Sequence, residues 1–223
     1  MDAHPPRTRQ AGALPLEALP LDPLRFDALL FDLDGVLVDS FEVWLAVVNE
    51  VRVRFGLPPV SREFVASIFG QGISDDLRNL YPGRTREDVL GAYDETMPRC
   101  IHRMQVNPEA VRVLDALGQR GVKRAVVTNT QQSLAVRVLD DAGLAPHVDA
   151  CVAVAPGLRE KPAPDLLQRA LGLLGVPPGR ALMVGDTEYD AQAARAAGTA
   201  FLRYEIRKGT RLSGALGLAP EGG

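Results

Sequence analysis

The feature that most constrains this chain is a short apolar run, residues 28–31, followed at once by two aspartates, Asp32 and Asp34. A continuous apolar run of this kind is typical of an interior strand of a parallel sheet. In such sheets ligands bind outside the carboxyl ends of the strands. Two neighbouring carboxylates repel each other there, and Mg²⁺, which prefers carboxylate oxygens, removes that repulsion. The segment therefore predicts a metal-assisted reaction in the loop after a parallel strand.

The composition indicates a globular protein with a buried core. Of the 223 residues, 46% are apolar and 24% are charged, which allows one large domain or a core with an insertion. The formal net charge of -3 provides no basic excess for a nucleic-acid partner. Cys100 and Cys151 are expected to be small buried side chains of a reduced protein. Because no apolar stretch is long enough to span a bilayer and no secretory signal is evident, we expect a cytoplasmic protein without a membrane partner.

The chain divides into an arm, a core and an insertion. Residues 1–24 are rich in Pro, Ala and Leu without a period, and we expect them to form an N-terminal arm outside the core. Residues 25–40 and 104–223 show strand patterns that alternate with helix patterns. This alternation predicts a single α/β core whose parallel strands are joined by crossover helices. The Gly-rich stretch after Ser213 is expected to be a frayed end.

The insertion comprises residues 41–103 and has a helical pattern. Its apolar residues recur at helical spacing from the start of the segment. Ser61 and Thr85 stand where they would cap the beginning of further helices, and Asp88 completes a capping box with Thr85. We therefore expect an α-helical domain of about sixty residues between the first and second strands of the core.

Polar side chains follow four of the predicted strands. In chain order they are Asp32 and Asp34, then Thr128 and Asn129, then Lys161, and finally Asp186 with Asp190 one helical turn later. Parallel strands place their carboxyl ends at one edge of the sheet, so these residues are expected to converge on one cleft. Several carboxylates with a hydroxyl and an ammonium favour a metal site beside an anion site, and phosphate is the natural anion.

These segments resemble the four motifs of the haloacid dehalogenase superfamily, in its phosphatase branch. The matching segments are Asp32-Leu33-Asp34-Gly35-Val36, Thr128-Asn129, Lys161-Pro162-Ala163-Pro164-Asp165 and Gly185-Asp186-Thr187-Glu188-Tyr189-Asp190. The resemblance covers nearly all of residues 26–204, and the insertion resembles the helical cap of phosphoglycolate-phosphatase-like members. It implies a Rossmann-like parallel sheet with an inserted cap, and an Mg²⁺-dependent phosphatase. Its partner would be a small phosphorylated metabolite such as phosphoglycolate or a sugar phosphate.

The resemblance implies a catalytic pair and a metal site. Asp32 would be the nucleophile that forms an aspartyl-phosphate, and Asp34 would be the general acid and base. Mg²⁺ would be held by Asp32, by the backbone carbonyl of Asp34 and by Asp186.

The resemblance also implies a phosphate site. The hydroxyl of Thr128, the backbone near Asn129 and the ammonium of Lys161 would bind the phosphate. Asp190 would orient Lys161 or a metal-bound water rather than bind the metal itself. We expect the enzyme to act as a monomer or a homodimer.

The choice of substrate is expected to lie in the insertion. The loop at residues 69–74 contains glycines that allow unusual backbone and close approach. Gly70, Gln71 and Ser74 are its candidates for contacting the substrate, with an ordinary turn as the alternative. Arg78 or Arg84 would be available to a substrate carboxylate.

Two other functions remain as alternatives. A phosphosugar mutase similar to β-phosphoglucomutase would carry a His shortly after the first motif and a Lys in the cap. Residues 40–44 contain no His and residues 41–103 contain no Lys, which counts against this reading. The same missing lysine counts against a phosphonatase, and Asp34 counts against a dehalogenase. The second alternative is a non-catalytic binding protein that shares the fold.

Overall fold

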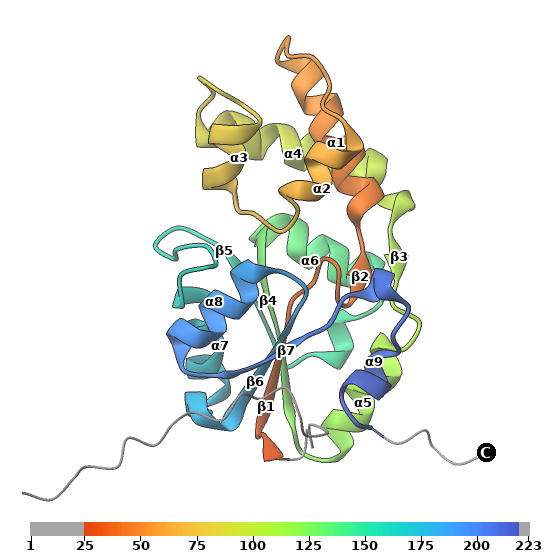
Figure 1. Ribbon diagram of the computed structural model, residues 1–223, viewed down its shortest axis with the longest axis vertical. Coiled ribbons are helices and arrows are strands. Elements are labelled where there is room, and N and C mark those ends of the chain that lie inside the picture. Colours follow the sequence, from red (N-terminus) through yellow and green to blue (C-terminus); the bar gives the residue numbers. More distant parts are fainter. Residues whose placement is uncertain (1–24, 219–223) are drawn as a thin grey trace, which may run out of the picture.

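The computed structural model describes residues 25–218, so the expected N-terminal arm lies outside the described residues. A five-stranded parallel sheet forms the centre of the core, with the strand order β5-β4-β1-β6-β7 (Figure 1). The strands are β1 (Ala28–Phe31), β4 (Lys123–Gln131), β5 (Ala150–Val154), β6 (Ala181–Gly185) and β7 (Ala200–Arg203). The first strand in sequence lies in the middle of the sheet, as its uninterrupted apolar run predicts.

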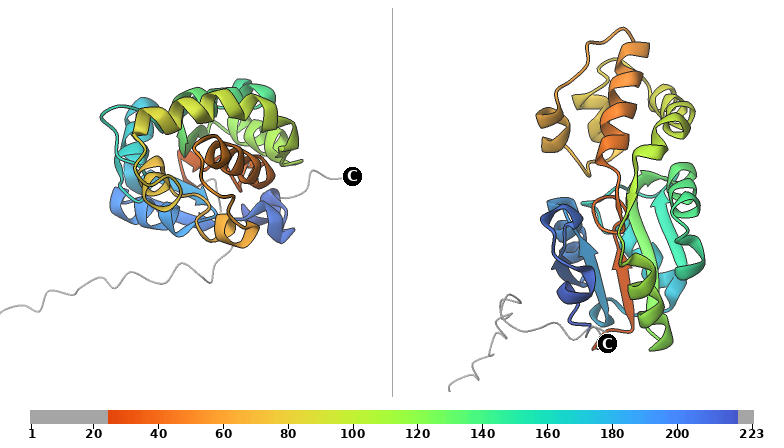
Figure 2. Two further views of the ribbon diagram at one scale, coloured as in Figure 1. Left: turned by 90° about the horizontal axis from the view of Figure 1, so that it is seen from above. Right: turned by 90° about the vertical axis from the view of Figure 1, so that its right-hand side faces the viewer.

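Helices cover both faces of the sheet. One face is covered by α5 (Ala110–Gln119), α6 (Gln132–Asp141) and α9 (Leu212–Ala215), and the other by α7 (Asp165–Leu174) and α8 (Glu188–Ala197). In Figure 1, α7 and α8 lie to the left of the strands and α5 and α9 to the right, and the right-hand view of Figure 2 looks from the α5 and α9 side. Within β1, Leu29 and Phe31 pack on the first face, whereas Ala28 and Leu30 pack on the second. Because successive strand residues point to opposite faces, a strand covered on both sides must be apolar throughout. The predicted α/β fold is confirmed.

The insertion forms a separate helical layer beyond the carboxyl edge of the sheet (Figure 1). Its helices are α1 (Phe41–Arg54), α2 (Arg62–Ser67), α3 (Ile73–Asn79) and α4 (Arg86–Cys100). The predicted caps are present, since Ser61 accepts a hydrogen bond from the Phe64 N–H and Thr85 forms a capping box with Asp88. The sequence pattern does not predict α3, whose first turn has no side-chain cap. The four helices surround an apolar core of their own.

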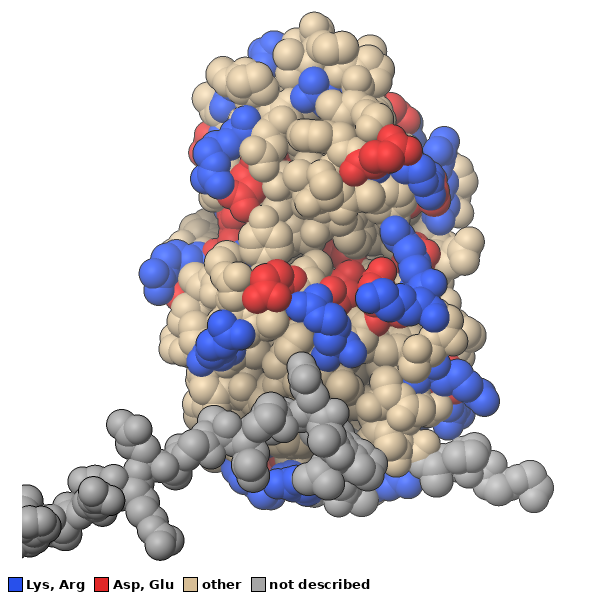
Figure 3. Space-filling view, in the orientation of Figure 1, with Lys and Arg blue, Asp and Glu red and all other residues tan. Residues whose placement is uncertain are grey.

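Two very short strands connect the insertion to the core. β2 (Val38–Asp39) pairs antiparallel with β3 (Gln105–Val106), so the two crossing segments lie side by side. The remaining short elements are 3₁₀ turns, η3 (Ile101–Arg103), η4 (Ala145–His147), η5 (Pro178–Arg180) and η6 (Ile206–Lys208). On the face shown in Figure 3, Asp and Glu side chains gather where the insertion meets the core, with Lys and Arg beside them.

The expectation of a frayed end after Ser213 is wrong as far as residue 218. Leu216 is fully buried and Leu218 is 8% exposed, and both belong to the core cluster on the α5 side of the sheet. Leu212 begins the short helix α9, Leu216 and Leu218 follow its end, and the burial of these leucines outweighs the high glycine content of the segment.

Two predictions from composition are also tested. Cys100 is buried as expected, Cys151 is partly buried, and both are free thiols. Within residues 25–218, no helix combines the length and the apolar character needed to cross a membrane.

Candidate active site

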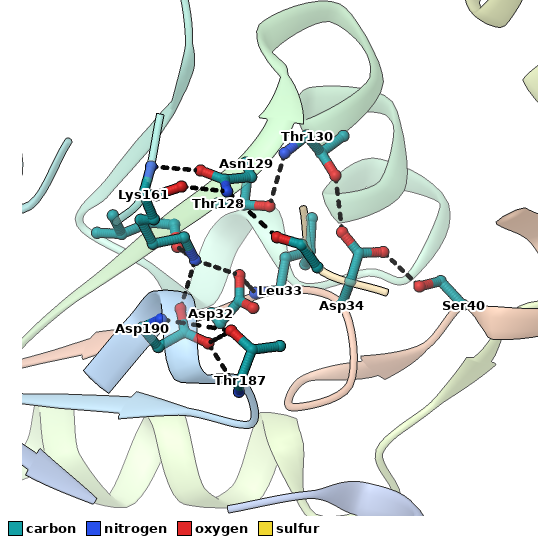
Figure 4. A network of polar contacts seen from close by, with 12 residues as sticks. Asp32, Leu33, Asp34, Ser40, Thr128, Asn129, Thr130, Lys161, Thr187 and Asp190 are labelled. Atoms are coloured by element: carbon teal, nitrogen blue, oxygen red, sulfur yellow. Dashed lines mark hydrogen bonds and ion pairs between the residues drawn. The ribbon is translucent and has the colours of Figure 1, made fainter. Parts of the chain in front are cut away.

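The residues predicted to converge do lie together at the carboxyl edge of the sheet. Figure 4 labels all of them except Asp186, which has a carboxylate oxygen within 4.8 Å of oxygens of Asp32 and Asp190. Asp32 follows β1, and its backbone N–H donates to the carbonyl of Val184 in the neighbouring strand. Thr128 lies within β4 and Lys161 lies in the loop that follows β5. Asp32, Thr128 and Lys161 are all less than 5% exposed. The sheet thus brings opposite charges into a buried cluster.

Lys161 is the cation of this cluster. Its Nζ lies 2.9 Å from Asp32 Oδ1 and 2.6 Å from Asp190 Oδ1. It also donates to the carbonyl of Val127 at 2.9 Å, so each of the three ammonium protons has an acceptor. Burial by itself would favour the neutral amine, but Asp190 and Asp32 outweigh that effect and raise the pKa of Lys161. The residue is therefore a fixed positive charge.

Asp190 holds Lys161 in place. Its carboxylate is fully buried, with Oδ1 on Lys161 and Oδ2 accepting from the Thr187 hydroxyl at 2.6 Å and from the Thr187 N–H at 3.0 Å. The bond from the Thr187 N–H, together with the Asp190 N–H that donates to the Thr187 hydroxyl, forms the capping box at the start of α8. Both oxygens are occupied, which suits a positioning residue better than a metal ligand.

Asp32 keeps one carboxylate oxygen free. Oδ1 accepts from the Leu33 N–H at 2.8 Å and contacts Lys161. Oδ2 accepts no hydrogen bond from residues 25–218. Burial raises the pKa of Asp32 well above its usual range, while the contact with Lys161 opposes this increase.

Asp186 carries a buried oxygen without a partner. Oδ1 receives no hydrogen bond from any described residue, and burial, with Asp190 nearby, raises the pKa of Asp186 to about 7. Carboxylate oxygens of Asp32, Asp186 and Asp190 lie within 4.8 Å of one another. A buried carboxylate oxygen without a donor is costly, and a divalent cation would remove that cost. The donor set fits a hard ion such as Mg²⁺.

Gly35 allows the loop after β1 to approach Asp186. Its φ is +88°, a left-handed conformation that residues with a Cβ rarely adopt. A Cβ at this position would lie 2.1 Å from Asp186 Oδ2. The first and fourth motifs can meet only because this residue has no side chain.

The Asp34 side chain accepts hydrogen bonds from three donors, of which Figure 4 labels Ser40 and Thr130. Oδ1 accepts from the Ser40 hydroxyl and from the Trp44 indole N–H, the latter at 3.2 Å. Oδ2 accepts from the Thr130 hydroxyl at 2.7 Å. With the carboxylate committed to these donors, its backbone carbonyl remains the group proposed for the metal.

Ser40, Trp44 and Thr130 were not among the site residues predicted from the sequence. Thr130 had a usable signal, because it lies two residues after Thr128 in one strand and so shares its face. Ser40 and Trp44 belong to the entry into the insertion, and no local pattern connects them with Asp34.

Thr128 and Asn129 differ in what their side chains do. Thr128 is 1% exposed, and its hydroxyl accepts a hydrogen bond from the Thr130 N–H at 3.1 Å. The Asn129 amide instead joins three segments. It accepts from the Lys161 N–H at 2.8 Å and donates to the Lys161 carbonyl at 3.0 Å. It also donates to the carbonyl of Gly70 at 3.2 Å, which connects the core to the insertion.

The candidate specificity residues separate into two groups. Gly70 and Gln71 line the cavity between the insertion and the core, together with Asp32 and Asp34. Ser74 does not line it, since its N–H and hydroxyl donate to Glu160 at 3.2 and 3.3 Å.

The two arginines considered for a substrate carboxylate also lie elsewhere. Arg78 forms an ion pair with Asp75, and it is exposed. Arg84 stacks on Phe55 with its guanidinium carbon 4.6 Å from the ring centre. Neither residue lines the cavity.

Comparison with known proteins identifies relatives over most of the chain. Residues 29–204 match the model of the haloacid dehalogenase-like hydrolase family. A phosphoglycolate phosphatase of Aquifex aeolicus is 30% identical over 169 residues, which are 75% of this chain and 79% of that protein. An N-acetylmuramic acid 6-phosphate phosphatase of Pseudomonas aeruginosa is 32% identical, covering 78% of this chain and 80% of that protein. The solved structure of a subfamily IA hydrolase of the same superfamily from Geobacter sulfurreducens is 28% identical. It covers 80% of this chain and 89% of that chain, with a TM-score of 0.63.

Proposed function

This chain belongs to the haloacid dehalogenase-like hydrolase family and is a phosphatase, and we propose that it hydrolyses a small phosphate monoester through an aspartyl-phosphate on Asp32. One observation carries this proposal. Asp32 presents a free carboxylate oxygen while its other oxygen is fixed by a buried ammonium 2.9 Å away. A nucleophile held in this way beside a permanent cation is suited to attack on an anionic ester.

In the first half of the reaction Asp32 Oδ2 attacks phosphorus and the bond to the leaving oxygen breaks. Lys161 balances negative charge on the phosphate and on Asp32, and the Thr128 hydroxyl donates to a phosphate oxygen. Asp34, in its protonated form, gives its proton to the leaving oxygen, which departs as an alcohol. General acid help of this kind contributes about 10²–10⁴-fold.

In the second half Asp34, now ionised, takes a proton from water. The water oxygen bonds to phosphorus and the bond to Asp32 breaks, which regenerates the free carboxylate and releases phosphate. The donors from Ser40, Trp44 and Thr130 keep the Asp34 carboxylate in one orientation during both halves. Because Asp34 is already oriented, proton transfer in both halves carries less of the entropic cost of bringing the group into position.

The residues present fit Mg²⁺. Asp32, Asp186 and the Asp34 carbonyl would hold it, with Asp190 committed to Lys161. When bound, it would offset the repulsion between an anionic nucleophile and an anionic substrate.

The test is phosphate release from a panel of small phosphate esters, with and without Mg²⁺. We expect metal-dependent release that Asp32→Asn abolishes. Asp27→Asn is the matched control, because Asp27 forms an exposed ion pair with Arg180 just before β1, outside the site. Equal release by wild type and Asp32→Asn would refute the proposal. Conversion of a sugar phosphate to its isomer without net release would establish a mutase instead.

A further inference from the structure

The cavity that Asp32 and Asp34 line has mostly apolar walls on the side of the insertion. It measures about 80 Å³, room for roughly half a dozen water molecules, since one needs about 10–15 Å³. Its walls in the insertion include Trp44, Val48, Ile68, Phe69, Leu90 and Tyr93. Asp76 is the charged residue that the insertion contributes to the described lining of this cavity. A leaving group must therefore be small and largely apolar.

The described lining of this cavity contains no Lys, Arg or His. Arg207 lines a different cavity, which shares Phe69 with this one and is also lined by Asp186. Its guanidinium is already paired with Asp39 at 2.6 Å and lies over the Phe41 ring. A carboxylate on the leaving group would enter a space that holds Asp34 and Asp76 and would meet no cation there. The cavity is unsuited to phosphoglycolate.

Asp76 is an anion with unused acceptor capacity. Oδ1 accepts from the Gln71 amide at 2.6 Å and Oδ2 from the Tyr93 hydroxyl at 2.8 Å. A carboxylate has about four acceptor positions, so two remain. Among residues 25–218 it has no ion-pair partner, whereas its neighbours Asp75 and Glu160 are paired with Arg78 and Arg86.

The surroundings of Asp76 favour a positively charged partner. Burial raises the pKa of Asp76 to about 6, with the hydrogen bonds from Gln71 and Tyr93 opposing the increase, so it is largely ionised at neutral pH. Trp44 and Tyr93 stand edge to face on the same wall, with ring centres 5.3 Å apart. Aromatic faces attract ammonium groups. A cation would gain from both the carboxylate and the rings.

We propose that the substrates of this site are phosphate monoesters of small amino alcohols, with the phosphate at Asp32, the carbon chain along the apolar walls and the ammonium at Asp76. This assignment of a substrate class rests on the phosphatase function proposed above. It departs from the expectation of phosphoglycolate, whose leaving group carries the opposite charge.

The first test compares three series of esters on the wild-type enzyme, namely ω-aminoalkyl, alkyl and ω-carboxyalkyl phosphates of matched chain lengths. We expect kcat/KM for the best aminoalkyl ester to exceed that of its alkyl counterpart roughly ten- to a hundredfold, the range of a charge-assisted hydrogen bond. The carboxyalkyl ester should be the poorest of each set. Equal or faster hydrolysis of carboxyalkyl esters would overturn the inference and leave the phosphatase function standing.

The second test uses Asp76→Asn with Asp75→Asn as its matched control. In Asp76→Asn, kcat/KM for the aminoalkyl ester should fall to about that for the alkyl ester, and a circular dichroism spectrum like that of the wild type shows that the variant is folded. Asp75→Asn should keep the preference, because Asp75 is paired with Arg78 and does not line the cavity. An unchanged amine preference in Asp76→Asn would overturn the assignment. Absence of release from every ester, or release that survives Asp32→Asn, would instead remove the proposed function.

Discussion

Replacing Glu109 by Gln is expected to destabilise the fold in a pH-dependent manner. Glu109 stands before α5 and ties the C-terminal segment to the core. It accepts from the Ser213 N–H and hydroxyl at 3.0 Å and forms ion pairs with Arg112 and Arg211. Burial opposes its ionisation, but the hydrogen bonds from Ser213 and Arg112 outweigh burial and lower the pKa of Glu109 from 4.5 to about 2.

The magnitude follows from the difference in proton affinity. One unit of pKa corresponds to about 1.4 kcal/mol, so ionised Glu109 can add up to about 3 kcal/mol to the free energy of unfolding. Arg211 and Arg112 are 74% and 40% exposed, and water screens their part. We therefore expect Glu109→Gln to cost about 2 kcal/mol at pH 7.

The sign of the pH dependence is fixed by the direction of the shift. Because the folded pKa is the lower one, the stabilisation is complete above 4.5 and disappears as the pH falls through about 2. Urea unfolding followed by circular dichroism, at pH 7 and pH 3, measures the difference between wild type and variant. That difference should fall to less than about half at pH 3.

The control is Glu95→Gln. Glu95 pairs with Arg54, and both side chains are at least half exposed, so the loss should stay below about 0.5 kcal/mol at either pH. A cost for Glu109→Gln that is the same at pH 7 and pH 3 would show that its charge is not the cause. A cost no larger than that of the control would refute the reasoning altogether.

Two further predictions concern the site. Gly35→Ala should weaken Mg²⁺ binding, measured by calorimetric titration, because the added Cβ would collide with the Asp186 carboxylate. The control is Gly83→Ala, which has a similar φ of +79° and open space around it and should bind Mg²⁺ normally. Thr130→Val removes one hydrogen bond to Asp34 without a change of shape and should lower kcat about tenfold or more with little change in KM. Steady-state kinetics test this against Thr199→Val, whose hydroxyl donates to the Ala194 carbonyl away from the site. An unchanged kcat in Thr130→Val would count against the role of Thr130.

Much of the fold and of the buried charge cluster could be predicted because the signals are local. The apolar run before Asp32 requires a strand covered on both faces, and the sheet then brings its end to Lys161 and Asp190. Ser61 and Thr85 start helices through contacts with residues only three positions later. In each case the determining interaction is either short in sequence or imposed by parallel pairing.

What could not be predicted depends on contacts between distant segments. The hydrogen bonds from Trp44 and Thr130 to Asp34 span 10 and 96 residues. Ser74, Arg78 and Arg84 were reasonable candidates by position, but Glu160, Asp75 and Phe55 are their actual partners. Strands of two residues, such as β2 and β3, leave no periodicity to read.

The paired strands β2 and β3 have a consequence for modularity. Because the chain leaves and re-enters the core at adjacent points, Val38 opposite Val106, the insertion resembles a cassette that recombination can exchange. Such an exchange would also affect the catalytic site, because Trp44 on α1 donates a hydrogen bond to Asp34 of the core. A chimera joined before residue 44 imports the donor's residue at this position along with its cavity, whereas one joined after it keeps the indole. The position of the junction within the first turn of helix α1 therefore decides whether a chimera that acquires a new cavity also keeps the Trp44 donor to Asp34.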